Sequence, residues 1–138
     1  MFYVVSSILC YDIWFYISHV ILHMPAVYPY HAEHHAKPEP QFLDTYVGHY
    51  LESPFQSIGV FVPLIYWPFD LPSFLIVLFV LNTRGMLRHD ERGVWLIGNH
   101  HLLHHKYSRW NFGEYWIDSL CGTAYPNTEE YRRGLIYF

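Results

Sequence analysis

Charged residues and cysteines are both scarce in this chain of 138 residues. Asp, Glu, Lys and Arg make up 14% of it, whereas a soluble domain averages about 25%. The two cysteines, Cys10 and Cys121, lack the spacing of a disulfide framework. We therefore expect no disulfide and a reducing compartment. The chain also has no run of basic residues, so we expect no nucleic-acid partner.

Three hydrolytic motifs are absent as well. The segment HAEHH, residues 31–35, is not the HExxH of zinc proteases. His31 and Glu33 form the HxE of zinc deaminases, but no PCxxC follows. No GxSxG nucleophile elbow occurs. These absences exclude the corresponding mechanisms.

Apolar residues, by contrast, make up 52% of the chain, and the first long run covers residues 2–22. It is long enough to cross a bilayer. It has no positive leading segment and no cleavage site, so we expect a membrane span and not a signal peptide. Asp12 and His19 lie inside it, and ionisable groups at that depth are usually functional. The alternative is a buried core helix of a soluble protein.

A second apolar region, residues 55–87, predicts a hairpin. Its arms meet at Pro68, Asp70 and Pro72, which indicate a turn. Each arm is short for a full span of about 20 residues. Two interpretations stay open: a tight hairpin whose helices continue into the polar region, or a re-entrant pair.

Eight of the eleven histidines recur in three spaced motifs. His19 and His23 form HxxxH; His31, His34 and His35 form HxxHH, and so do His101, His104 and His105. Residues at i, i+3 and i+4 share one face of a helix, so each motif can direct two or three imidazoles at one point. Eight such side chains exceed the needs of one ion, which predicts two metals. Imidazole suits zinc, copper, iron and nickel, so spacing alone does not select the metal.

These patterns predict one domain over residues 1–138. Its fold class is all-α: an integral-membrane helical bundle with a histidine-lined di-metal site, built from residues 19–35 and 89–105. The basic residues all lie in or beside the histidine segments: Lys37, Arg84, Arg88, Arg92, Lys106, Arg109, Arg132 and Arg133. By the positive-inside rule, we expect the site to face the cytosol.

Three segments resemble the fatty acid hydroxylase and sterol desaturase superfamily. Residues 12–35 match its order of Asp, Tyr, HxxxH and HxxHH. Residues 49–56 match a segment with His, an acidic residue and Gln, here His49, Glu52 and Gln56. Residues 100–123 match its closing HxxHH, Asn-aromatic-Gly, Trp/Asp and Gly-Thr. The resemblance covers nearly the whole chain.

The resemblance implies a di-iron centre that uses O2 to hydroxylate or desaturate a fatty acyl chain, sterol or carotenoid. Nine residues are the expected ligands: His19, His23, His31, His34, His35, His89, His101, His104 and His105. Since nothing in the chain resembles a flavin, haem or Rossmann site, electrons must come from outside. The resemblance implies a donor such as cytochrome b5 or ferredoxin, and the endoplasmic reticulum if the source is eukaryotic.

Further residues are candidates to hydrogen-bond the ligands from outside: Asp12, His49, Glu52, Asn111 and Asp118. Asp12 lies about two turns before His19, on the same helix face. Glu52 with His49 suits the carboxylate that ligand histidines commonly contact. His100 points about 100° away from His101 on a helix, which indicates an outer or surface position.

Two departures from the superfamily stand out. A further HxxxH usually precedes the last motif; His89 fits its second histidine, but Gly85 stands at its first. The ligand is therefore missing, or water, His49, Asp90 or another group replaces it. The superfamily's chains are also longer, so we expect a minimal version or a homo-oligomer.

Two other function classes remain as alternatives. One is a non-catalytic membrane protein that binds metal. The absence of a ligand at Gly85 would favour it if that absence inactivates one of the two metal sites. The other is a zinc-dependent hydrolase.

Overall fold

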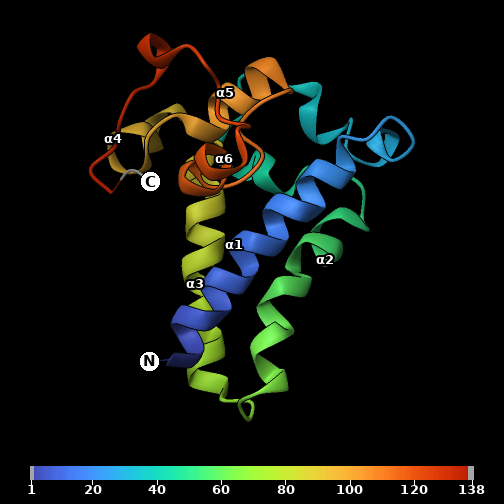
Figure 1. The fold of residues 1–138 in the computed structure, drawn as a ribbon, viewed down its shortest axis with the longest axis vertical. Helices are drawn as coiled ribbons and strands as arrows, with labels where there is room; N and C mark the ends of the chain where they lie inside the picture. The colour runs from blue at the N-terminus through green and yellow to red at the C-terminus, as the bar shows by residue number, and fades with distance from the viewer. Residues whose placement is uncertain (1, 137–138) are drawn as a thin grey trace.

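The computed structural model describes residues 2–136, and every regular element in that range is a helix (Figure 1). This confirms the all-α prediction. The α-helices are α1 (Phe2–Leu22), α2 (Glu52–Ser57), α3 (Leu71–Arg88), α4 (Val94–Ile97), α5 (His100–Tyr107) and α6 (Tyr115–Cys121). The 3-10 helices are η1 (Tyr28–Tyr30), η2 (His34–Ala36), η3 (Phe42–Tyr46), η4 (Ile58–Ile65), η5 (Glu91–Gly93) and η6 (Thr128–Glu130).

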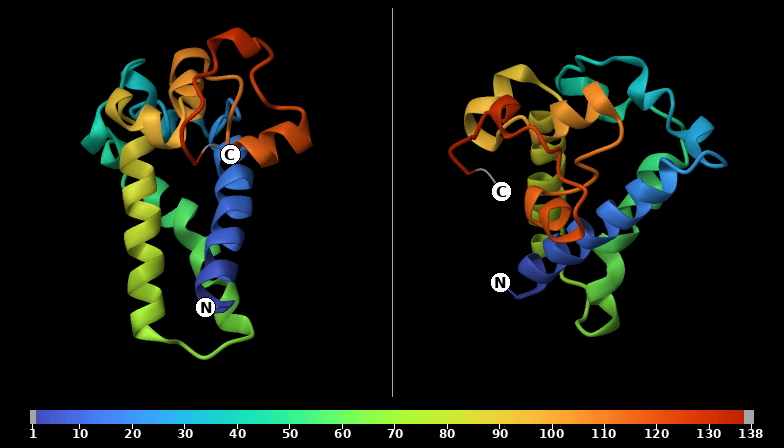
Figure 2. Two further views of the ribbon diagram at one scale, coloured as in Figure 1. Left: turned by 90° about the vertical axis from the view of Figure 1, so that its left-hand side faces the viewer. Right: turned by 45° about the horizontal axis from the view of Figure 1, so that its top comes forward.

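Three helical rods descend from a cap of short elements (Figures 1 and 2). The rods are α1, the continuous pair α2–η4, and α3. The cap contains α4, α5 and α6. At their rises per residue the rods are about 31, 25 and 27 Å long, close to the roughly 30 Å of a bilayer's hydrocarbon core. Both α1 and α3 are long and apolar enough to cross a membrane.

The surface of the rods is apolar. Outward-facing side chains on α1 include Phe2, Val5, Leu9, Ile13 and Ile17. Polar side chains on the same helix point inward: Ser7, Asp12 and Ser18 are buried. Exposure of such an apolar surface to water favours aggregation, whereas contact with lipid carries no such penalty. The pattern is therefore that of a helical membrane bundle.

The apolar hairpin of residues 55–87 forms two antiparallel arms (Figure 1). Asp70 caps α3 by accepting a hydrogen bond from the Ser73 amide at 3.2 Å, and Pro72 occupies the first turn. The descending arm consists of α2 and the 3-10 helix η4, which contains Pro63. The turn of residues 66–70 lies at the end opposite the cap.

Close packing joins α1 to η4 at Gly59. A Cβ atom there would lie 2.6 Å from the Cys10 carbonyl oxygen and 2.7 Å from the Trp14 Cβ. Only glycine permits this approach. Below it, Val60, Val77 and Leu81 form a small buried core between the rods.

Candidate metal centre

All nine predicted ligand histidines meet where the rods enter the cap. They form two groups, and within each the side-chain nitrogens lie within 4.8 Å of one another. The five-histidine group contains His19, His23, His31, His35 and His104. The four-histidine group contains His34, His89, His101 and His105.

Each HxxHH motif directs two imidazoles to one group, in agreement with the expectation of two or three at one point, and sends its third imidazole to the other group. His31 and His35 enter the five-histidine group, while His34 enters the other. In the second motif His101 and His105 pair in the four-histidine group, and His104 crosses to the other. Positions i and i+4 point the same way on a helix, whereas adjacent residues diverge by about 100°.

The two motifs also differ in backbone. The second lies on α5, an α-helix of eight residues. The first lies on a turn that ends in the three-residue 3-10 helix η2, and the hydrogen bond from the His35 amide to the His31 carbonyl is 3.4 Å long. A single helical turn is enough to place His31 and His35 on one side.

Backbone carbonyls orient the rings by accepting hydrogen bonds from Nδ1. The Nδ1 of His19 lies 2.6 Å from the Phe112 oxygen, and that of His104 lies 2.7 Å from the Trp110 oxygen. His34 and His89 use the carbonyls of Val47 and Gly85, at 2.9 and 2.7 Å. In the neutral ring the proton then resides on Nδ1, and Nε2 presents a lone pair.

The spacing of these lone pairs fits metal ligation. The Nε2 atoms of His34 and His89 lie 3.0 Å apart although both Nδ1 atoms donate to carbonyls. Two bare lone pairs at that distance repel, so they cannot form a hydrogen bond with each other. Two ligand nitrogens at about 2.1 Å from one ion and at right angles are separated by about 3.0 Å. The spacing therefore suits a cation shared by the two rings.

Burial keeps the imidazoles neutral. Loss of water, followed by repulsion from neighbouring histidines, lowers the pKa of His23 to about 4 and of His35 to about 3. Burial likewise lowers the pKa of His89 to about 3. The same causes lower the pKa values of His31, His101, His104 and His105. Neutral imidazole is the form that binds metal.

Glu52 contacts the five-histidine group from outside, as predicted. Its Oε1 lies 3.0 Å from Nδ1 of His31. The other oxygen, Oε2, is buried and has no hydrogen-bond partner among residues 2–136. A carboxylate behind a ligand imidazole orients the ring and increases its basicity. The buried carboxyl therefore also fits a site designed for cations.

Asp118 and Asn111 do not contact the ligand rings and instead bond to the backbone near them. Asp118 accepts hydrogen bonds from the amides of Phe112 and Gly113, at 2.9 and 2.8 Å, and so fixes the carbonyl that orients His19. His100, which is buried and lies outside both groups, contacts the same carboxylate at 3.0 Å. Asn111 adopts a left-handed φ of 62° and bonds to the His100 carbonyl.

Two expected outer contacts are not formed. The His49 ring packs on Tyr30 and Tyr50, with centroids 5.0 and 4.4 Å away, and touches neither histidine group. Asp12 pairs with Arg84 instead of His19. An arginine opposite it on α3 provides a stronger partner than a neutral ring two turns away.

The structure also shows whether His49 or Asp90 replaces the histidine that the superfamily has at the position of Gly85. The Asp90 carboxylate is occupied by Arg92 and the Phe42 amide, and His49 is remote. Gly85 itself contributes its carbonyl to His89. Neither His49 nor Asp90 therefore replaces a ligand at position 85.

A charged network beside the centre escaped the sequence analysis. Arg84 contacts both Asp12 and Glu114, and Arg88 contacts Glu114. The network ties α1, α3 and the segment before α6 together. The only signal was Asp12 inside an apolar run, which required a partner; nothing in the spacing identified Arg84 or Glu114.

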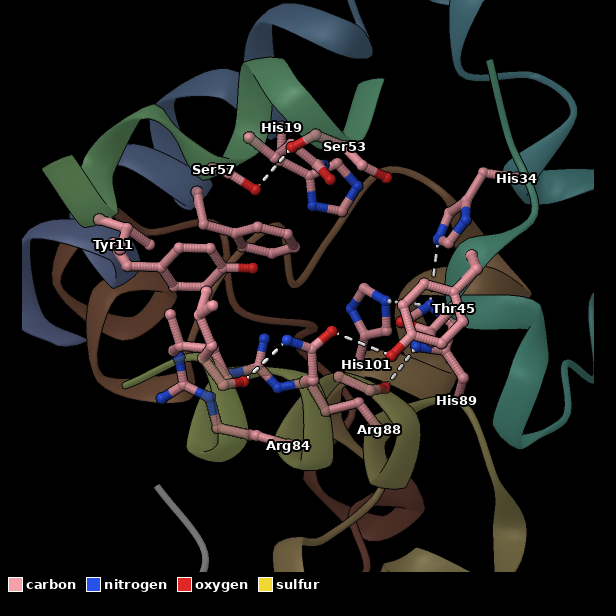
Figure 3. A pocket seen from close by; sticks show the side chains of 18 of the residues that line it. Tyr11, His19, His34, Thr45, Ser53, Ser57, Arg84, Arg88, His89 and His101 are labelled. Carbon is pink, nitrogen blue, oxygen red and sulfur yellow. Dashed lines mark hydrogen bonds between the residues drawn. The ribbon is translucent and has the colours of Figure 1, made fainter. Parts of the chain in front are cut away.

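A cavity of about 170 Å³ opens beside the four-histidine group (Figure 3). His34, His89 and His101 form one wall, and Val60, Phe61, Leu78 and Leu81 line the end towards the rods. Tyr11, Thr45 and Gln56 line it as well. A bound molecule would therefore reach the histidines while its apolar part stays among the rods.

Comparison with known proteins identifies a family. The model of a family described as fatty acid hydroxylase matches residues 4–123, which is most of the chain and includes both histidine groups. No curated protein and no solved structure shows a significant match.

Proposed function

Because the chain belongs to the fatty acid hydroxylase family, we propose that it is a membrane enzyme that uses two iron ions and O2 to hydroxylate or desaturate a lipid. The observation that carries this proposal is the convergence of nine neutral imidazoles into groups of five and four. When bound, an iron pair supplies the activation of O2 and the oxidation of an unactivated C–H bond.

The residues of the chain have three tasks in this proposal. The carbonyls of Val47, Gly85, Trp110 and Phe112 hold the ligand rings in one orientation. Glu52 holds the His31 ring in place through its contact with Nδ1. The cavity places a lipid segment against His34, His89 and His101. Its apolar end excludes water from that segment.

The membrane arrangement is part of the proposal. The three rods lie in the bilayer, and the cap faces the cytosol because the basic residues gather there. An external donor such as cytochrome b5 or ferredoxin delivers electrons to the cap. A homo-oligomer would cover more of the apolar rod surface.

Metal analysis of the purified protein tests the proposal. We expect two irons per chain and an oxygenated or desaturated lipid that forms only with O2 and reductant. Stoichiometric zinc with turnover in the absence of O2 would instead identify a hydrolase. Metal without any turnover would indicate a binding protein.

Ligand variants provide the second test. His34→Ala, His35→Ala, His104→Ala and His105→Ala should each abolish product formation, because each removes a ring from one group. His49→Ala is the matched control, since its ring packs on Tyr30 and Tyr50, accepts a hydrogen bond from the Leu51 amide and belongs to neither histidine group. Normal turnover in any two of the four variants would contradict the di-iron assignment.

A further inference from the structure

A chain of aromatic rings leads from the four-histidine group towards the surface of the cap. The ring of Tyr131 stacks on that of His100, the chain neighbour of the ligand His101, with centroids 5.9 Å apart and planes inclined by 19°. Tyr125 comes next, with its centroid 6.4 Å from that of Tyr131, and Tyr107 stacks on Tyr125 at 4.4 Å and 11°. All three tyrosines are half-buried, so the chain ends where solvent can reach it.

Asn111 couples the inner links of this chain by hydrogen bonds. Its side-chain amide donates to the His100 carbonyl at 2.9 Å. Its Oδ1 accepts from the Tyr131 hydroxyl at 2.9 Å and from the Tyr125 backbone amide at 2.7 Å. Asn111 is fully buried. One side chain therefore fixes His100, Tyr131 and Tyr125 relative to one another.

The outer tyrosines have a proton acceptor that the inner one lacks. The hydroxyls of Tyr107 and Tyr125 each donate to the Glu130 carboxylate, at 2.8 Å. Tyr131 instead donates to the amide oxygen of Asn111, which is a very poor base. A phenol that has lost an electron is a far stronger acid than a carboxylic acid, so Glu130 can take its proton. An oxidised Tyr131 keeps its positive charge and regains an electron from Tyr125.

Charge and stacking make the outer pair the end point of such electron transfer. Two stacked rings share a positive charge, so the pair of Tyr107 and Tyr125 loses an electron more easily than a single ring. The Lys106 ammonium lies 4.9 Å from the Tyr107 centroid and opposes a positive charge on that ring. Tyr125 is therefore the ring on which the missing electron settles.

Another tyrosine lies beside the histidines but leads to no further tyrosine. The Tyr28 centroid is 5.6 Å from that of His23 and 6.4 Å from that of His35. Within residues 2–136 its ring contacts are with histidines alone. Tyr28 is thus the natural competitor against which the chain can be tested.

We propose that the chain from His100 through Tyr131 to Tyr125 carries an oxidising equivalent away from the metal centre when O2 has oxidised the centre with no lipid in place. The inference rests on the proposed function for the iron pair and its oxidation by O2. An oxidant able to attack an unactivated C–H bond also attacks its own ligand rings when no substrate is present. The chain spares those rings.

The electron and the proton leave Tyr125 in different directions. The electron passes through Tyr131 and His100 to the iron pair, which is reduced by one electron, and the phenolic proton goes to Glu130. A neutral phenoxyl radical and a neutral carboxyl group remain. A small soluble thiol then gives one hydrogen atom to Tyr125, and Glu130 releases its proton to water. Two of the resulting thiyl radicals combine to form a disulfide.

Electron paramagnetic resonance tests the proposal. Protein loaded with iron(II) in detergent, without added lipid or thiol, is mixed with O2 and frozen rapidly. We expect a radical signal that narrows when ring-deuterated tyrosine is incorporated and that disappears when glutathione is added before freezing. Tyr125→Phe should remove most of the signal although the ring and its packing remain. Glu130→Gln is the second variant and should also lower the signal, because the proton acceptor is lost.

Two control variants and a second measurement complete the test. Tyr66→Phe, at the exposed turn between the rods, and Tyr28→Phe should both retain the signal. Tyr131→Phe should increase the oxidation of the ligand histidines, measured by mass spectrometry of peptides, because phenylalanine cannot relay the electron. A signal that persists in Tyr125→Phe, or that is lost in Tyr28→Phe, would overturn the inference. Equal histidine oxidation in Tyr131→Phe and the natural protein would overturn it as well.

Iron content and lipid product, measured on the same samples, separate this inference from the proposed function. Two irons and an oxidised lipid without any tyrosyl signal would overturn only the electron path. Absence of bound iron would overturn the proposed function and, with it, the inference.

Discussion

At the scale of single residues, the neighbours in each His-His pair would serve different ions under the proposed function. His34 and His35 diverge into separate groups, as do His104 and His105. Adjacent residues of the backbone therefore contribute to both groups, but no histidine side chain belongs to more than one group. Variants at adjacent positions can address one site at a time.

The first prediction uses this separation. His35→Ala should lower the metal content of the five-histidine group, and His105→Ala that of the four-histidine group, each by about one ion per chain because one ring leaves each site. Quantitative metal analysis of the purified variants checks it. His49→Ala should retain the full content; loss of all metal in both ligand variants would contradict separate sites.

The second prediction concerns Gly85. A side chain there would enter the cavity that His34, His89 and His101 share, with its Cβ 3.1 Å from the Thr45 hydroxyl oxygen. Gly85→His should slow the release of metal to a chelator, because it adds a nitrogen to the four-histidine group. Gly85→Phe fills the same space without a donor and should not. Equal chelation rates for the two variants would exclude a ligand role at this position.

At the scale of elements, the packing of α1 on η4 depends on one missing side chain. The Cβ of an alanine at position 59 would clash with the backbone of α1, and overpacking of this kind costs about 1–3 kcal/mol. The two rods cannot separate without disturbing the core of Val60, Val77 and Leu81.

The third prediction follows from that contact. Gly59→Ala should lower the melting temperature in detergent, whereas Gly85→Ala should raise it or leave it unchanged, since alanine favours an α-helix by up to about 1 kcal/mol over glycine. Gly85 faces only the Thr45 hydroxyl within 3.4 Å, a side chain that can move. Equal melting of Gly59→Ala and the natural protein would show that α1 and η4 are not closely packed.

The helical rods and the convergence of the nine histidines could be predicted from the sequence, because apolar run length and side-chain period are local properties. Contacts between distant segments could not. A contact of Asp12 with His19 is expected because both lie on one helix face, but the Asp12 carboxylate instead pairs with Arg84, which is 72 residues away. The carbonyls of Phe112 and Trp110 were not predicted either, since every residue has a carbonyl and only the fold selects one.

At the scale of the whole molecule, acidity opposes folding of the metal-free protein. The unfolded chain binds protons at histidines with pKa values near 6.5, while folded His23, His35 and His89 bind them only near pH 3 to 4. The unfolded state therefore gains protons first as the pH falls.

The fourth prediction is the resulting pH dependence. Stability of the metal-free protein should fall as the pH drops from about 6.5 towards 4, by up to about 1.4 kcal/mol per pH unit for each buried imidazole. Thermal melting at pH 7.5 and pH 5 checks it, and His49→Ala should show the same decrease. A melting temperature that is equal or higher at pH 5 would contradict the neutral, buried state of these rings.

The fifth prediction concerns orientation. The cap and the turn of residues 66–70 lie at opposite ends of the rods. In a Cys10→Ser, Cys121→Ser background, Ser108→Cys should react with an impermeant reagent only after the membrane is opened. Asp70→Cys should react from outside. Labelling of position 108 in intact cells would reverse the topology, and no labelling of position 70 would favour a re-entrant hairpin.

The nitrogens that meet in each group come from distant parts of the chain. His34 and His89 are 55 positions apart, and His35 and His104 are 69 apart. An ion shared by such pairs acts as a cross-link that closes these long loops, so its binding free energy is also folding free energy. During synthesis the centre cannot close until residue 105 has been made. The rods can pack before that point, and few apolar residues of the cap are buried. We therefore expect bound metal to fix the cap after the rods have assembled; fast hydrogen exchange confined to the cap of chelated protein would record that order.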